Sequence, residues 1–121
     1  MFLATSNEVK QVLLLSYIGQ VVPGELQRSR QDGEKLMAGL RPGFRVLADF
    51  GRLEAMDTAC VAEVGRLMEL LDQKGVGLLV RVMPDASKDI GMDILAIFHY
   101  RHHPATVTCK TMEEAAKKLS L

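Results

Sequence analysis

Residues 44–82 read FRVLADFGRLEAMDTACVAEVGRLMELLDQKGVGLLVRV, and this stretch decides the fold. Residues 44–50 are mostly apolar, which is typical of a strand buried on both faces of a sheet. Asp57 is a suitable N-cap for the periodic apolar segment that follows, so we expect a helix that ends near Gly75. Residues 76–82 predict a second buried strand, which ends before Pro84. A strand, a helix and a strand with short connections favour a parallel sheet covered by helices.

The upstream segment continues this alternation of strands and helices. Residues 9–22 predict one long strand, bent at Gly19 and paired with a short strand at residues 2–5. Pro23 then marks the start of a helix that runs to about Gly39.

The downstream segment adds a helix, a strand and a terminal helix. Ser87 is expected to cap the first of these helices, which should carry four apolar side chains inward: Ile90, Ile94, Ile97 and Phe98. A short strand follows at residues 105–109, and Thr111 and Glu114 form a capping box that opens the terminal helix. The sequence therefore predicts an α/β fold, a single layered domain over residues 1–121, with a mostly parallel (mixed) sheet of four to five strands and about four helices.

Charge and hydropathy exclude several classes of function. Fifteen basic and fifteen acidic residues cancel, which removes the positive footprint of non-specific nucleic-acid binding. The longest apolar runs, such as residues 12–15 and 76–80, are too short for membrane insertion. The first five residues do not resemble a signal peptide, and Cys60 and Cys109 lack the CxxC spacing, which suits free thiols in a reducing compartment. We therefore expect a cytoplasmic protein.

Three histidines within five residues form the densest group of functional side chains, and we consider them candidates for ligand binding: His99, His102 and His103. A zinc site needs three or four converging ligands, but adjacent side chains point apart and no CxxC or HExxH motif frames these histidines. A polar helix end, where histidine and Arg101 lie favourably against the helix dipole, is the simpler interpretation. We predict no metal site.

Catalysis through a cysteine and one of these histidines is a further alternative, because triads are assembled in space and not in sequence. Cys109, however, lies in a predicted buried strand, where a thiol has a raised pKa and little reactivity. The chain also lacks the GxxxxGK[ST] and GxGxxG loops of nucleotide-binding proteins. We therefore predict no catalytic residue and no cofactor.

Three carboxylates follow the strand at residues 44–50 and run into the next helix: Asp49, Glu54 and Asp57. Ligands of open α/β sheets gather beyond the carboxyl ends of the strands, so a magnesium ion or a general base is conceivable here. Helix capping by Asp57 and solvation of Glu54 explain the same residues more simply.

Residues 46–50 and 55–60 together resemble the central signature of STAS domains, in which a strand leads into Asp-Ser/Thr-Ser/Thr-Gly at a helix start. Gly19 and residues 25–26 match the family's turn from strand to first helix, and residues 111–116 resemble its closing capped helix. A second set of residues, 81–91, 98–100 and 102–103, looks like an SpoIIAA-like branch of this superfamily that lacks an established activity.

The resemblance implies a non-enzymatic regulatory domain that binds proteins, like the anti-sigma-factor antagonists. In such members a hydroxyl of the motif accepts phosphate from a partner kinase, and the added charge breaks the partner complex. The matching positions here are Asp57, Thr58, Ala59 and Cys60; Thr58 keeps a hydroxyl, Ala59 lacks the second one, and Cys60 replaces the glycine. The resemblance thus assigns a regulatory and partner-binding role to Asp57, Thr58 and Cys60, with an anti-sigma-factor-like kinase as partner.

An alternative function is the binding of a small apolar ligand or lipid. The chain has seven methionines, which make adaptable apolar surfaces, although methionine is also a common filler of protein cores. An enzyme that uses His102 or His103 ranks last, because it needs a pocket in which a histidine meets a cysteine or an aspartate. A homodimer is left open by the sequence.

Overall fold

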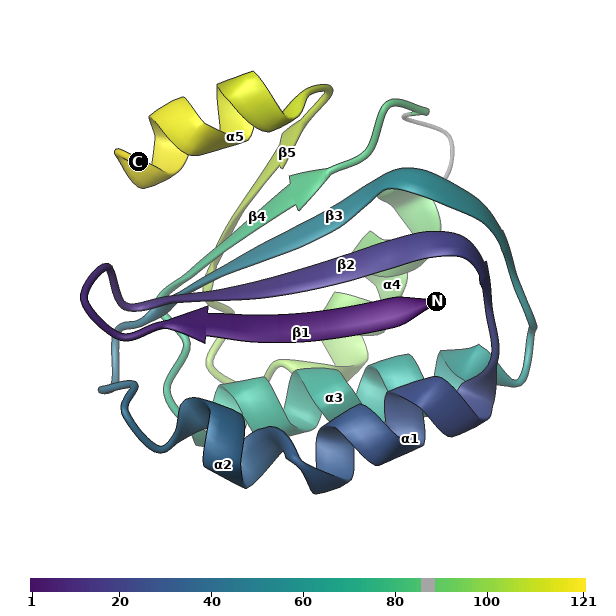
Figure 1. The fold of residues 1–121 in the computed structure, drawn as a ribbon, viewed down its shortest axis with the longest axis horizontal. Helices are drawn as coiled ribbons and strands as arrows, with labels where there is room; N and C mark the ends of the chain where they lie inside the picture. The colour runs from purple at the N-terminus through teal and green to yellow at the C-terminus, as the bar shows by residue number, and fades with distance from the viewer. Residues whose placement is uncertain (86–88) are drawn as a thin grey trace.

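The computed structural model contains one five-stranded sheet with helices on both of its faces (Figure 1). It describes the backbone of residues 1–85 and 89–121, and the side chains of residues 1–85 and 91–121. In chain order the elements are β1 (Phe2–Asn7), β2 (Val12–Val21), α1 (Pro23–Gln31), α2 (Gly33–Met37), β3 (Arg45–Met56), α3 (Cys60–Gln73), β4 (Leu78–Val82), α4 (Asp89–His99), β5 (Ala105–Cys109) and α5 (Met112–Leu119).

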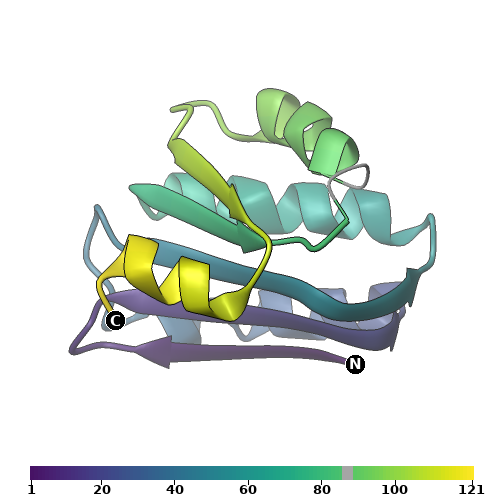
Figure 2. The same cartoon turned by 90° about the horizontal axis from the view of Figure 1, so that it is seen from above.

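The strand order follows the sequence, β1-β2-β3-β4-β5. β1 and β2 form an antiparallel hairpin, and each later pair is parallel. This confirms the predicted mixed, mostly parallel sheet. Helices α1 to α4 cover one face and α5 covers the other, as the turned view shows (Figure 2). The larger core therefore lies between the sheet and α1–α4, and a smaller one, with Val80 and Leu119, lies under α5.

The helix expected from Pro23 to about Gly39 is two helices, α1 and α2, which meet at Asp32. Gly33 begins α2 at a point where a Cβ atom would lie only 2.9 Å from Leu70 of α3. A side chain at position 33 would therefore require Leu70 to move. The described residues form five helices, one more than the estimate of about four.

β3 is much longer than the strand expected at residues 44–50, because it continues to Met56. Among the described residues its added half pairs with β2 alone, through two register shifts that flank Ile18 and Gly19. Gly19 has φ +61°, so the bend expected there is present. The pairing of β3 with β4 stops at Asp49 and Val82. The second half of β3 consequently has one edge without a paired strand among the described residues, and four of its last six residues are exposed: Gly51, Arg52, Glu54 and Ala55.

The inward face predicted for α4 is wrong. Ile94, Ile97 and Phe98 are 52%, 67% and 77% exposed, whereas Met92 is buried in the core together with Tyr100, which follows the helix. The helix carries apolar residues on several sides, so periodicity alone could not identify the buried one. Ser87, expected as its cap, and the side chain of Ile90 lie outside the described residues. The capping residue of α5 is as predicted: the Thr111 hydroxyl accepts a hydrogen bond from the Glu114 N–H at 3.2 Å.

Candidate functional site

The turn between β3 and α3 carries the residues singled out by the sequence. α3 begins at Cys60 with Ala59 as its N-cap residue, so Asp57 is not the N-cap itself. Asp57 instead closes the preceding turn: its Oδ1 accepts the Ala59 N–H at 2.9 Å, and its own N–H donates to the Val21 carbonyl at 3.3 Å. The turn is thus tied to the end of β2, and it presents Asp57 and Thr58 to solvent.

Cys60 points the other way, into the core. It is fully buried, and its thiol donates to the Val21 carbonyl at an Sγ–O distance of 3.5 Å. Burial raises the pKa of this thiol, and the nearby Asp57 carboxylate raises it further. A neutral, buried thiol anchors the first turn of α3 but offers no surface to a partner. The three predicted regulatory residues therefore share one turn, but only Asp57 and Thr58 face outward.

Two hollows flank this turn and share Met56 and Met92. We call them together the β3–α4 groove. One, of about 390 Å³, lies between the second half of β3 and the segment after β4. The other, of about 350 Å³, lies between the first turns of α3 and the helix α4. Their lining consists of Phe50, Gly51, Leu53, Glu54, Ala55, Met56, Val61, Val64, Met83, Pro84, Asp85, Gly91, Met92, Ile94 and Leu95.

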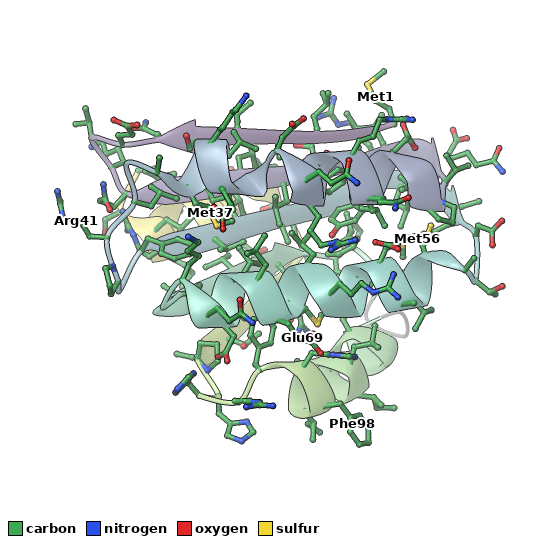
Figure 3. The ribbon with its side chains drawn as sticks, turned by 90° about the horizontal axis from the view of Figure 1, so that it is seen from below. Met1, Met37, Arg41, Met56, Glu69 and Phe98 are labelled. Carbon is green, nitrogen blue, oxygen red and sulfur yellow. The ribbon has the colours of Figure 1, made fainter. Side chains whose placement is uncertain are left out.

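The groove leads onto an exposed apolar surface. Val61 on α3 is 48% exposed, and Ile94 faces it from α4 across the second hollow. Figure 3 shows Met56 at the end of β3, close to the start of α3, and Phe98 projecting away from the far end of α4. Phe98 therefore lies apart from the groove, whereas Val61 and Ile94 are exposed apolar side chains beside a cleft, which is typical of an interaction site.

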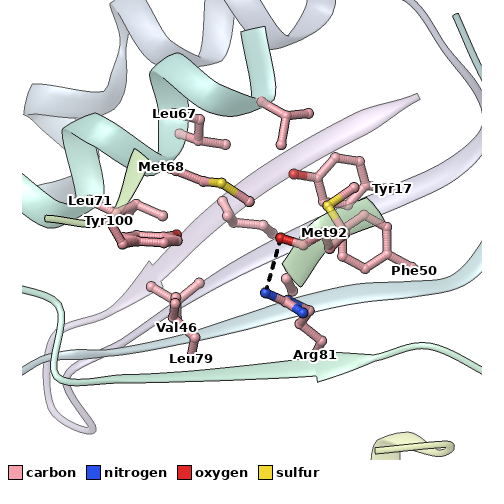
Figure 4. Close-up of a pocket in the computed structure, with 13 residues that line it drawn as sticks. Tyr17, Val46, Phe50, Leu67, Met68, Leu71, Leu79, Arg81, Met92 and Tyr100 are labelled. Carbon is pink, nitrogen blue, oxygen red and sulfur yellow. Dashed lines mark hydrogen bonds between the residues drawn. The ribbon is translucent and has the colours of Figure 1, made fainter. Parts of the chain in front are cut away.

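A separate cavity lies inside the larger core, between the sheet, α3 and α4 (Figure 4). Its volume of about 30 Å³ suits about two water molecules and is far too small for a lipid. Tyr17 and Tyr100 line it, and burial raises the pKa of both phenols, so they stay neutral. Tyr17 also stacks on Phe50, with ring centroids 4.3 Å apart. The cavity therefore gives no support to an enclosed lipid site.

Arg81 is the functional side chain that the sequence interpretation missed. It projects from β4 toward α4 and is only 4% exposed. Its Nη1 donates to Asp93 Oδ1 at 2.7 Å, and its Nη2 donates to the Met92 carbonyl at 3.5 Å (Figure 4 draws the second bond). An arginine in the middle of an apolar strand was the available signal, since a buried charge needs a partner. The pair fastens α4 to the sheet.

The three histidines do not converge. His99 Nδ1 lies 2.8 Å from Glu69 Oε1, and His102 Nδ1 lies 3.1 Å from both carboxylate oxygens of Asp72. His103, with φ +44°, lines a different hollow, beside Arg81. Within the described part of the chain, no group of three histidine, cysteine or acidic residues could hold a metal ion.

The pair of His102 and Asp72 is the histidine–aspartate contact that an enzyme of this kind would need. Burial alone would raise the pKa of Asp72, but hydrogen bonds from the backbone and ring of His102 hold it below its usual range. The hollow beside the pair measures about 330 Å³, and its described lining contains no serine, threonine, cysteine or lysine that could act as a nucleophile. The two histidine–carboxylate pairs link α3 to the segment of residues 99–102.

The sequence matches no protein-family model and no curated protein. Among the described residues, no helix is both long and apolar enough to cross a membrane.

Three solved structures nevertheless superpose on this chain over nearly its whole length. An uncharacterised protein of the DUF3478 family from Shewanella loihica, described as having a SpoIIAA-like fold, superposes with a TM-score of 0.72 at 12% identity, covering 98% of this chain and 92% of that one. The anti-sigma factor antagonist SpoIIAA in its unphosphorylated form gives a TM-score of 0.60 at 16% identity, covering 99% and 98%. The Bacillus cell fate determinant SpoIIAA in its phosphorylated form gives 0.60 at 19% identity, covering 98% and 99%. The chain therefore has a SpoIIAA-like fold.

Proposed function

We propose that this protein is a non-enzymatic regulatory domain that docks a protein partner at the turn before α3, and that negative charge at Thr58 sets the affinity for the partner. The observation that carries the proposal is the position of Thr58: it is exposed at the start of a 14-residue helix, next to the open β3–α4 groove. A kinase of the anti-sigma-factor type is our first candidate partner, on the basis of the fold.

The physical basis of the switch is electrostatic. A phosphate on Thr58 would add about 1.5 to 2 negative charges at a helix N-terminus, where backbone N–H groups and the helix dipole favour an anion. Asp57 and Glu54 are exposed on the same stretch of chain, so the charge of this surface would become strongly negative. Charges placed within or beside an interface change affinity, salt dependence and partner choice.

The test compares Thr58→Ala with Thr58→Glu as baits for proteins from the native cells, with quantitative mass spectrometry as readout. Thr5, which is exposed on β1 and far along the sequence, supplies the matched pair Thr5→Ala and Thr5→Glu. We expect at least one partner whose capture differs about fivefold or more between the Thr58 variants and does not differ between the Thr5 variants. Equal capture by all four baits would refute the switch.

A small apolar ligand is the second candidate, because the larger hollow of the groove is mostly apolar and has a volume within the range of ligand sites. Native mass spectrometry of the freshly purified protein tests it. A bound mass, or a thermal shift with fatty acids that Met56→Glu removes, would support a carrier. A bare mass with no thermal shift would argue against one.

We also place the protein in the cytoplasm. Both cysteines are free and buried, which fits a reducing compartment.

A further inference from the structure

The β3–α4 groove follows an open edge of the sheet. β4 pairs with β3 only as far as Asp49, and β3 then runs on to Met56 with β2 as its one pairing strand among the described residues. The larger hollow lies along this edge, since residues 50–56 supply most of its lining. Backbone N–H and C=O groups at a strand edge are a template for an added strand of another chain.

The apolar lining suits anchoring side chains of such a strand. Met56, Met83 and Met92 lie together in the larger hollow, and methionine adapts its shape to different partners. A peptide that pairs with the edge could place an apolar side chain into this hollow while its backbone bonds to β3. A lipid would use the apolar lining but not the backbone groups.

The charged residues around the groove favour a partner segment of positive charge. Glu54 is an exposed carboxylate in the lining of the larger hollow, and Asp57 adjoins that lining in sequence after Met56. Arg52, which is exposed on the same half of β3, lies outside the lining. Among the described lining residues of both hollows there is no lysine or arginine. A groove edged by carboxylates attracts a positively charged segment and repels a negatively charged one.

We propose that the second half of β3 binds a lysine- or arginine-rich, extended segment of a partner protein by strand addition, with an apolar side chain anchored among the three methionines. This inference rests on the proposed function, because it names the chemistry of the partner that docks beside Thr58. It also predicts the direction in which phosphorylation changes the affinity. A phosphate on Thr58 strengthens the binding of a basic segment, whereas the family resemblance implies release of the partner.

The experiment uses three fluorescent peptides of about ten residues, roughly the length of two short strands. All alternate valine with a second residue, which is lysine, serine or glutamate. Fluorescence anisotropy at low salt should give a Kd for the lysine peptide at least tenfold lower than for the serine peptide, and no binding of the glutamate peptide. Its affinity should fall as salt is raised, since exposed charges are screened. N-methylation of alternate amides of the lysine peptide should abolish binding, because it removes the donors needed for strand pairing.

A matched pair of variants tests whether the lysine peptide binds at the open edge of β3. Ala55 is exposed in the groove, on the open edge of β3, and Ala105 is exposed on the outer strand β5. Ala55→Lys should weaken binding of the lysine peptide at least tenfold, whereas Ala105→Lys, with the same change in net charge, should leave the Kd within about twofold. Circular dichroism checks that both variants are folded. Thr58→Glu should tighten binding about threefold or more relative to Thr58→Ala.

The outcomes separate this inference from the proposed function. Equal binding of the lysine and serine peptides, equal effects of Ala55→Lys and Ala105→Lys, undiminished binding of the N-methylated peptide, or no binding at all would each overturn strand addition by a basic segment. Self-association that Ala55→Lys removes would assign the edge to a second copy and overturn it as well. None of these results changes the outcome of the capture experiment with the Thr58 and Thr5 baits, which tests the proposed function independently.

Discussion

Replacing Asp93 by alanine should lower the free energy of unfolding by about 2 kcal/mol, because it removes a close anionic partner of a buried guanidinium. Arg81 is 4% exposed on β4, and its Nη1 lies 2.7 Å from Asp93 Oδ1 on α4. The helix that this pair holds forms one wall of the β3–α4 groove. The prediction therefore tests both the attachment of α4 to the sheet and the stability of one wall of the groove.

The magnitude follows from the unequal burial of the two partners. Opposite unit charges about 4 Å apart gain about 4 kcal/mol at an effective dielectric constant near 20. The Asp93 side chain is 61% exposed, so water screens the pair and leaves roughly half of that value. A loss of about 2 kcal/mol corresponds to a decrease in Tm of roughly 6–10 °C for a chain of this size.

Urea unfolding followed by circular dichroism measures the loss for Asp93→Ala, Arg81→Met and the double variant. Arg81→Met should cost less than about 1 kcal/mol, since an apolar side chain of similar length replaces a buried charge. The double variant should resemble Arg81→Met, which gives a coupling energy of about 1–2 kcal/mol. Lys117→Ala is the control: its pair with Glu113 at 3.9 Å is exposed on both sides and should contribute less than about 0.5 kcal/mol. If Asp93→Ala costs no more than this control, or the two changes are simply additive, the pair does not fasten α4.

Three further predictions use the same unfolding measurements. Gly75→Ala should cost about 1–3 kcal/mol, because φ is +88° and an added Cβ would lie 3.1 Å from a proline. Gly91→Ala in α4, where an added Cβ would meet no described atom within 4 Å, should instead stabilise by about 0.5–1 kcal/mol, and equal effects would contradict this. Asp72→Asn should cost more at pH 7 than at pH 3. The carboxyl has a lowered folded pKa, so its contribution is present above the usual carboxyl range and is lost as pH falls toward that folded pKa; a cost independent of pH would exclude this role. Phe98→Ser should change stability by less than about 0.5 kcal/mol, whereas Met92→Ala should cost about 2–4 kcal/mol, and similar losses would refute the orientation of α4.

The alternation of strands and helices could be predicted from the sequence because each element carries its own local signal. The two predicted apolar strands lie next to each other in the sheet, where residues 45–49 pair in parallel with residues 78–82, as expected for strands joined by a helix. Thr111 caps α5 through its hydroxyl, and Gly19 bends β2 with a positive φ. Turn, capping and periodicity signals depend on neighbours in sequence, so they can be identified without the tertiary structure.

The orientation of α4 and the length of β3 depend on distant residues instead. The buried side of α4 is set by Arg81, which holds Asp93 next to the strand, and neither residue signals the other in sequence. Residues 51–55 contain Gly, Arg and Glu and do not resemble a buried strand, yet β2 pairs with them as far as Met56. Long-range pairing thus overrides a local pattern that favours a loop.

The candidate site follows from this difference in strand length. β3 has 12 residues and β4 has five, so the two parallel strands begin together and β3 extends beyond its neighbour. The segment after β4 turns away toward β5, where the Met83 N–H donates to the Cys109 carbonyl at 2.8 Å. An edge is thereby opened inside the sheet, next to the turn that presents Thr58. Extending β4 to cover this edge would remove the groove and leave Thr58 exposed, so the docking edge and the charged switch are separable parts of one surface.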